Sequence, residues 1–195
     1  MTITADLERI RHQYLNKIVE TQAIKDYKET IDVFGKKIGP LSKGNHYKME
    51  FWIAKSFLKR DIIRLVGKDE STEGEEVIGK LDVQEIQKIA FDQGRSHDIN
   101  DIGKNLFTAI KEYLDVLSYR VKMKLTPEKK YKTLFSNIQD LIMIRHRRIL
   151  NLSHMKQSLK VTQNLTQEEK ILMKNLTENL TSWKDFFQNN TNKDI

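Results

Sequence analysis

The sequence predicts a mostly α-helical protein with a small α/β domain near its N-terminus. Three observations support this. The 195 residues include only 8 Gly and 2 Pro, and strong helix formers such as Lys, Leu and Glu are abundant. Beyond residue 80, apolar residues recur at spacings of three and four, as on amphipathic helices. Between residues 29 and 68 the spacing changes to two and Gly and Pro interrupt it, which is typical of strands and turns.

The composition limits the possible classes of protein. A chain of this length can bury one large core, or a large core with a small satellite, which disfavours a multi-domain enzyme. The absence of Cys excludes disulfides, Cys-ligated zinc and a thiol nucleophile. The sequence shows neither a signal-like start nor an apolar run approaching eighteen residues. We therefore expect a cytoplasmic protein without a membrane segment.

Residues 1–28 are expected to form an N-terminal helix that begins near Thr4. Their apolar residues follow one another at spacings of mostly three and four, which places them on one stripe: Leu7, Ile10, Tyr14, Leu15 and Ile18. This stripe has to pack against another part of the protein.

Residues 29–68 are expected to form the small α/β domain. A strand near residues 30–34 is followed by Gly and Pro turns, an alternating strand that ends at Phe51, a helix from Trp52, and a strand over 62–66. Trp52, with Phe51 and Ile53 beside it, lies where a strand becomes a helix. A buried indole there would anchor the domain. The alternative is an exposed anchor for a binding partner.

Residues 69–79 are acidic and lack an apolar period, so they are expected to form a linker that uncouples the small domain from the rest. Residues 80–195 are expected to form a helical assembly domain. Its helices are predicted over 81–89, over 101–121, from Thr126-Pro127 past Leu150, and from a capping box formed by Thr166 and Glu169.

A basic cluster on the third of these helices contains the candidate contact residues Arg145, Arg147 and Arg148. Arg147 and Arg148 are free to face solvent, whereas Arg145 lies on the apolar stripe between Ile142 and Ile149 and calls for a carboxylate partner. Three interpretations of Arg145 remain open. It extends its head to solvent at a helix–helix contact, forms a salt bridge to another subunit, or contacts phosphate.

The sequence does not point to catalysis. The five His residues are scattered, and none forms the spacing of a helical zinc site. Neither a phosphate-cradling Gly loop nor a Gly-x-Ser-x-Gly elbow occurs. We therefore expect a protein that is not an enzyme and that uses no cofactor or metal.

Residues 29–153 resemble the GINS family, the four-part accessory complex of the archaeal and eukaryotic replicative helicase. The resemblance lies in the order of short patterns along the chain: Gly39-Pro40, a Gly turn, a strand, Phe51-Trp52-Ile53-Ala54, a strand, the helix of Leu81 to Ile89 with its Asp82-Val83 pair, the helix of Asp101 to Val121, and the helix of Leu134 to Leu152 with Asp140 and Arg145. Because the β-rich part comes first, the match is to the two-three-type subunit of archaea.

The resemblance implies a function without a reaction of its own. A subunit of this type forms a hetero-oligomer, a tetramer with the five-one-type subunit, and contacts the MCM helicase ring and a RecJ-like replication protein at the replication fork. It acts there as a scaffold that activates unwinding, with at most weak, non-specific DNA binding. The net charge of +7 and pI near 9.4 permit weak, salt-sensitive attraction to DNA. The alternative is therefore a basic helical module that binds nucleic acid or regulates transcription.

Overall fold

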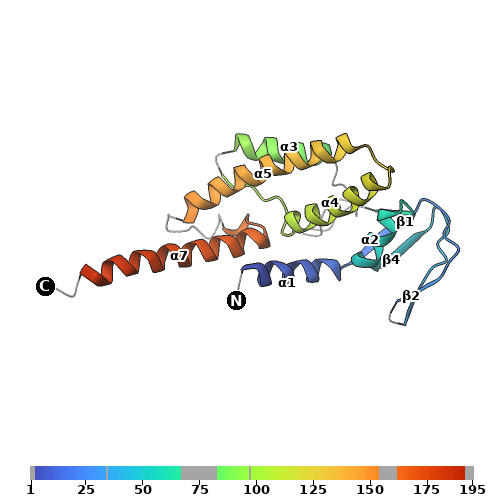
Figure 1. Cartoon of the computed structure of the whole chain (residues 1–195), viewed down its shortest axis with the longest axis horizontal. Coiled ribbons are helices and arrows are strands. Elements are labelled where there is room, and N and C mark those ends of the chain that lie inside the picture. The colour runs from blue at the N-terminus through green and yellow to red at the C-terminus, as the bar shows by residue number, and fades with distance from the viewer. Residues whose placement is uncertain (1–2, 34, 67–82, 97, 154–161, 192–195) are drawn as a thin grey trace.

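The computed structural model describes residues 3–33, 35–66, 83–96, 98–153 and 162–191. It confirms a mostly helical protein with a small sheet region near the N-terminus (Figure 1). The expected acidic linker, residues 69–79, lies outside the described residues. The elements, in chain order, are α1 (Ile3–Leu15), β1 (Ile18–Ala23), β2 (Ile31–Val33), β3 (Lys36–Ile38), β4 (His46–Glu50), α2 (Phe51–Lys59), β5 (Ile63–Leu65), α3 (Val83–Arg95), α4 (Leu106–Lys122), α5 (Glu128–Ser153) and α7 (Gln167–Thr191).

The strand β1 corrects the prediction of one helix over residues 1–28. The helix ends at Leu15, and β1 forms the centre of an antiparallel sheet with the strand order β4-β1-β5. The sequence Ile18–Ala23 alternates, so that Thr21 and Ala23 are buried while Ile18 is exposed. Ile18 fits the helical spacing of α1 only by coincidence. The residues after it alternate with a period of two, and they form a strand.

The strands β2 and β3 form a separate hairpin after β1. Gly35 and Gly39, which punctuate this part of the sequence, both have positive φ values, of 78° and 99°. A Cβ atom at Gly39 would collide with the backbone carbonyl of Glu29, so this turn requires glycine.

Two of the three anchor residues predicted for the small domain are buried. Phe51 and Ile53 are nearly inaccessible, whereas Trp52 is only partly buried at the edge of the cluster around Ala54 and Phe57. Phe51 makes an edge-to-face contact with Tyr14, with ring centroids 5.3 Å apart. Phe51 therefore belongs to the core shared with the helices, and the expected burial of the Trp52 indole is found only in part.

The small domain packs directly against the helices, contrary to the expectation that a linker uncouples them. Tyr14 and Phe51 belong to the same buried cluster as residues of α3, α4 and α5. At the same boundary, the buried carboxylate of Glu112 on α4 accepts hydrogen bonds from Arg11 on α1, at 2.6 Å, and from Lys55 on α2. Arg120 on α4 also pairs with Asp61 at 2.6 Å. Apolar and ionic contacts thus fix the two parts together.

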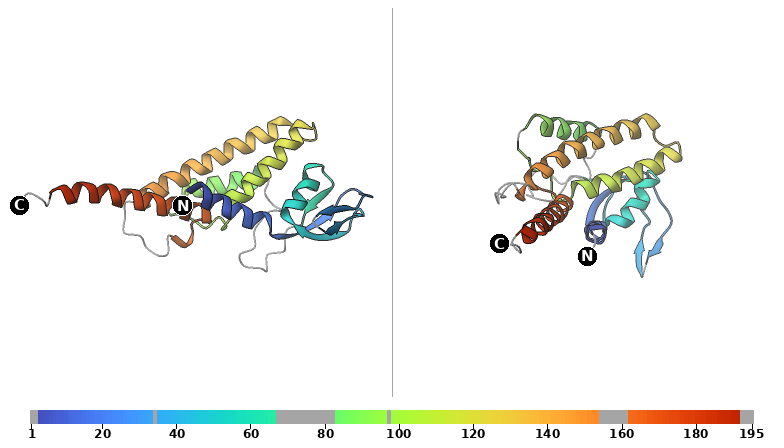
Figure 2. Two further views of the ribbon diagram at one scale, coloured as in Figure 1. Left: turned by 60° about the horizontal axis from the view of Figure 1, so that its bottom comes forward. Right: turned by 60° about the vertical axis from the view of Figure 1, so that its left-hand side comes forward.

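The helices α4 and α5 form an antiparallel hairpin, and α3 lies along α5 (Figures 1 and 2). The helix expected over 101–121 begins only at Leu106, because Gly103 has a φ of 91° and its N–H bonds the Asp101 carboxylate in a preceding loop. The last helix, α7, begins beside α1 and α5, and its C-terminal half projects beyond the other helices (Figure 2). Among the described residues, no helix is both long and apolar enough to cross a bilayer.

Candidate assembly surface and the network that positions it

Arg145 is a buried structural residue, which corrects its prediction as a subunit or phosphate contact. Its side chain is 1% exposed, and its guanidinium donates to both carboxylate oxygens of Glu169, at 2.7 and 2.5 Å. The same group also donates to the Gln93 side chain and to the carbonyls of Asn100 and Asn164. The carboxylate partner that the apolar stripe calls for comes from the same chain.

Glu169 performs two tasks at the start of α7. Its carboxylate accepts the backbone N–H of Thr166 at 2.9 Å, and its own N–H donates to the Thr166 hydroxyl at 3.2 Å. This is the capping box expected from the sequence, and it is confirmed. Because the same carboxylate pairs with Arg145, the first turn of α7 is fastened to α5 and, through Gln93, to α3.

Arg148 and Arg147 have different environments. Arg148 donates to the backbone carbonyls of Gln93, Ser96 and Asp98 just beyond the last turn of α3, where carbonyls lack helical partners. It acts as a cap for α3 and is not free to contact phosphate. Arg147 is exposed on α5. Arg145 and Arg148 therefore both donate to the side-chain oxygen of the buried Gln93. Arg147 takes no part in these hydrogen bonds.

The projecting half of α7 carries large aromatic side chains in solvent. Trp183, Phe186 and Phe187 are 63%, 63% and 54% exposed, and the rings of Trp183 and Phe187 lie 4.8 Å apart. We call these three residues the aromatic end. Exposed clusters of this kind are unusual on monomeric proteins and mark interaction surfaces.

The aromatic end continues an apolar stripe that begins on the packed half of α7. Leu172, Leu176, Leu180, Trp183 and Phe187 follow at spacings of three or four, so they share one side of the helix. We call them the α7 stripe. Leu172 and Leu176 pack against the protein's own core, whereas every residue from Thr181 to Gln188 is exposed. The same spacing is present in the sequence from Leu172 to Phe187, so the period of the stripe could have revealed it.

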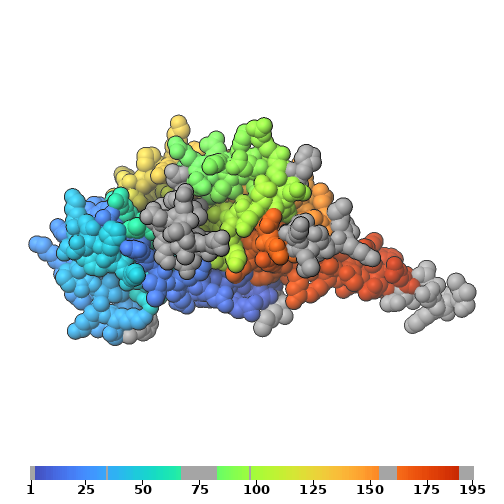
Figure 3. Space-filling model, turned by 180° about the vertical axis from the view of Figure 1, so that it is seen from behind, coloured from blue at the N-terminus to red at the C-terminus, as the bar shows by residue number. Residues whose placement is uncertain are grey.

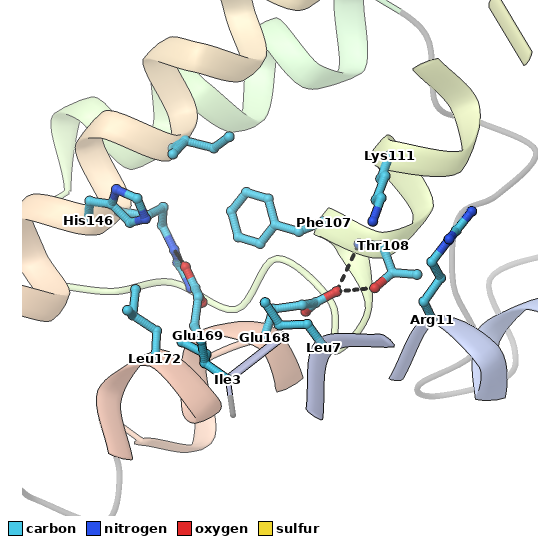
Figure 4. Close-up of a pocket in the computed structure, with 12 residues that line it drawn as sticks. Ile3, Leu7, Arg11, Phe107, Thr108, Lys111, His146, Glu168, Glu169 and Leu172 are labelled. Carbon is cyan, nitrogen blue, oxygen red and sulfur yellow. Dashed lines mark hydrogen bonds and ion pairs between the residues drawn. The ribbon is translucent and has the colours of Figure 1, made fainter. Parts of the chain in front are cut away.

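A pocket of about 400 Å³ lies between α1, α4, α5 and the first turns of α7 (Figure 4). Its walls are mainly apolar, with Ile3, Leu7, Phe107, Ile142 and Leu172. In Figure 4, Glu168 reaches from α7 toward Thr108, whose backbone N–H and hydroxyl both donate to Oε1, at 2.8 and 2.5 Å. The other oxygen, Oε2, is buried and has no hydrogen-bond partner among the described residues.

Basic side chains also line the pocket, but most are already neutralised. Arg11 donates to Glu112 and Glu8, and the hydrogen bond to Glu112 raises the pKa of Arg11 despite partial burial. The hydrogen bond from Arg11 and the charge of Lys111 lower the pKa of Glu8. Arg145 is paired with Glu169. Glu168 Oε2 lies buried beside this space without a hydrogen-bond partner among the described residues.

The described residues contain no group of three or more His, Asp or Glu side chains that could hold a metal ion. The site chemistry found in the structure is that of packing and hydrogen bonding. Scans against protein-family models and against curated proteins gave no match to this chain.

Proposed function

We propose that this chain is a non-catalytic scaffold subunit of a GINS-like complex, which assembles with a partner subunit through α7 and contacts the MCM helicase at the replication fork. By its order of parts it corresponds to the two-three-type subunit. The partner subunit is then of the five-one type, and a RecJ-like protein is the further contact.

The arrangement of the chain is consistent with this proposal. A small sheet-bearing domain precedes a helical part and packs beside it, as the resemblance over residues 29–153 implies. The exposed aromatics lie on α7 of the helical part, after the last residue to which the resemblance extends, so they support assembly by their exposure alone.

The observation that carries the proposal is the aromatic end of α7. The capping box and the Arg145–Glu169 pair hold the start of the helix, so the projecting half presents Trp183, Phe186 and Phe187 in a defined direction. Leaving these rings in water forgoes the favourable burial of large apolar surface. A helical partner lying along the projecting half of α7 would recover it, and a stable interface of standard size buries roughly 1,200–2,000 Å² in total.

The test is co-expression with the five-one-type subunit from the same genome, followed by light scattering on the size-exclusion peak. We expect a complex well above the 23.0 kDa of the single chain. Replacing Trp183, Phe186 and Phe187 by Ala should abolish it. A matched triple replacement of exposed apolar residues elsewhere, Phe91, Phe135 and Met143, should leave it intact. A folded monomer that ignores the partner, or a complex that survives loss of the aromatic end, would reject the proposal.

One observation favours the second candidate function, contact with nucleic acid. The turn between α4 and α5 and the helix ends beside it carry the exposed residues Lys122, Lys124, Lys129 and Lys130. Clustered lysines bind phosphate backbones without sequence preference, with dissociation constants of about 10⁻⁴ to 10⁻⁶ M near physiological salt. Titration with random and selected DNA at two salt concentrations distinguishes the functions. Nanomolar binding to one sequence would favour the regulator over the scaffold.

A further inference from the structure

A second pocket, of about 380 Å³, lies at the surface between the C-terminal end of α3 and the C-terminal part of α5. Arg95, Arg147 and Arg148 line it, and we call it the arginine pocket. None of its described lining residues is acidic. Guanidinium groups are the side chains best suited to bind phosphate or carboxylate, because they donate two parallel hydrogen bonds. The pocket is therefore a candidate site for an anion.

Arg148 prepares this pocket for an anion without being its main ligand. The carbonyls at the end of a helix carry partial negative charge, which repels anions. Arg148 donates to the carbonyls of Gln93, Ser96 and Asp98 at the end of α3, the last at 2.8 Å. Because these contacts use most of its N–H groups, the donors that remain for a bound anion come from the other two arginines.

Arg95 and Arg147 are both exposed, and neither has a hydrogen bond or an ion pair to another described residue. The Arg95 guanidinium lies over the ring of Phe91, 5.3 Å from its centroid. Phe91 itself is 59% exposed. An exposed ring beside unpaired guanidinium groups provides a stacking surface for a nucleobase and donors for a phosphate at the same place.

The outer face of α5 connects the arginine pocket with the lysines at the α4–α5 turn. Lys129 and Arg147 are 18 residues apart, which corresponds to about five helical turns and about 27 Å along the axis. Both therefore lie on the same side of the helix. The exposed residues between them on this side are Thr133, Ser136, Asp140 and Met143. A ligand with repeated phosphates can contact both ends of this line, whereas a single anion cannot.

We propose that the arginine pocket binds a phosphate of a single-stranded nucleic acid, that a neighbouring base stacks at Phe91, and that the strand continues along α5 to the lysines of the α4–α5 turn. A single strand fits better than a duplex, because a base has to be unstacked to reach the ring. An acidic peptide would match the charge but lacks the planar base. None of these residues lies on α7, so the site is independent of assembly through the aromatic end.

The first experiment measures binding of a fluorescent oligothymidylate of about 15 nucleotides to the isolated chain by anisotropy, at several salt concentrations. We expect a dissociation constant of about 10⁻⁴ to 10⁻⁶ M near physiological salt. Arg147→Ala should weaken binding about 3- to 10-fold at low salt. It should also reduce the slope of log affinity against log salt by about 0.7, the share of one phosphate on a single strand.

Arg9→Ala is the matched control, because it removes the same charge from an exposed position on α1, which does not line the pocket. It should leave the salt slope unchanged. Equal effects of Arg9→Ala and Arg147→Ala would show that only the net charge matters and would overturn the proposal. Absence of measurable binding by the wild-type chain at low salt would do the same.

The second experiment separates stacking from charge. Phe91→Ala should weaken binding at least about 5-fold and leave the salt slope unchanged, because it removes a stacking surface and no charge. Phe186→Ala, at an exposed ring on α7, should have no effect. Asp140→Asn removes the acid on the line between Lys129 and Arg147, so it should tighten binding. Unchanged affinity in Phe91→Ala would refute the stacking, and weaker binding by Asp140→Asn would refute the path along α5.

The third experiment compares ligands. A duplex of the same length and an oligoglutamate of matched charge should both bind more weakly than the oligothymidylate. A duplex that binds equally well would exclude the single strand, and an oligoglutamate that binds equally well would assign the pocket to an acidic peptide. Both outcomes overturn the proposal. All these measurements use the isolated chain, so a failure to assemble with the five-one-type subunit would reject the proposed function and leave this test unaffected.

Discussion

At the scale of single residues, the Arg145–Glu169 pair decides how α7 leaves the protein. The apolar stripe around Arg145 indicates that this residue needs a carboxylate but does not name the partner, because Glu169 lies 24 residues away and also fits the capping box. One carboxylate serves both contacts. The sequence therefore predicted that Arg145 has a carboxylate partner but not which residue supplies it. Only the folded chain brings α5 and α7 together.

The first prediction concerns this pair. Arg145→Ala should lower the free energy of unfolding by about 3–5 kcal/mol, because it leaves the buried Glu169 carboxylate without its cation. Arg147→Ala, on the exposed face of the same helix, should change it by less than about 0.5 kcal/mol. Urea unfolding followed by circular dichroism measures both. Similar small losses in the two variants would mean that the buried pair adds little.

The second prediction compares neighbouring aromatic residues of the small domain. Phe51→Ala should cost about 3–5 kcal/mol, as does removal of a large buried ring, because Phe51 contacts Tyr14 and the helical core. Trp52→Ala should cost less, since Trp52 is only partly buried. The same urea measurements apply. A larger loss at Trp52 would make it the main anchor of the small domain, as predicted from sequence.

At the scale of elements, the sequence predicted the structure correctly where its local signals agreed. It failed where two signals competed. The capping box gave the start of α7, and Gly and Pro gave the turns around β2 and β3. The boundary between α1 and β1 was missed because Ile18 fits both periods. The pocket could not have been predicted, because four helices distant in sequence supply its walls.

The third prediction concerns the two halves of α7. Ending the chain after Glu178 should leave the stability of the protein nearly unchanged, because the residues from Thr181 to Gln188 are exposed and bury little. Hydrogen exchange on the intact chain should be slow from Lys170 to Thr177 and fast beyond Thr181. Binding of the partner to the shortened chain should be lost. Strong exchange protection in the projecting half of the isolated chain would show that it is already packed.

At the scale of the whole molecule, the small domain and the helices share one buried cluster. Sequence composition suggested uncoupled parts, because residues 69–79 read as a linker. The contacts that join the parts come from elsewhere, through Tyr14 and Phe51 in the shared core and Glu112 at the ionic boundary. A linker in the sequence does not determine whether the parts it connects pack together.

The fourth prediction tests this coupling. The wild-type chain should unfold in a single calorimetric transition, because its two parts share a core. Glu112→Ala leaves Arg11 and the largely buried Lys55 without this carboxylate, and it should lower the melting temperature of the whole protein. Glu128→Ala, at an exposed i,i+4 pair, is the control and should change little. Two separate transitions in the wild type would contradict a shared core.

The chain contains two tryptophans, and they lie toward opposite ends of the molecule, Trp52 on α2 and Trp183 on the projecting half of α7 (Figure 1). Seen from behind, the space-filling view shows the same separation between the cyan small domain and the red end of α7 (Figure 3). Their surroundings differ, since one indole is partly buried and the other is 63% exposed. Trp183→Phe and Trp52→Phe variants therefore provide two optical reporters, one whose emission follows unfolding and one whose emission shifts to shorter wavelength as a partner covers α7.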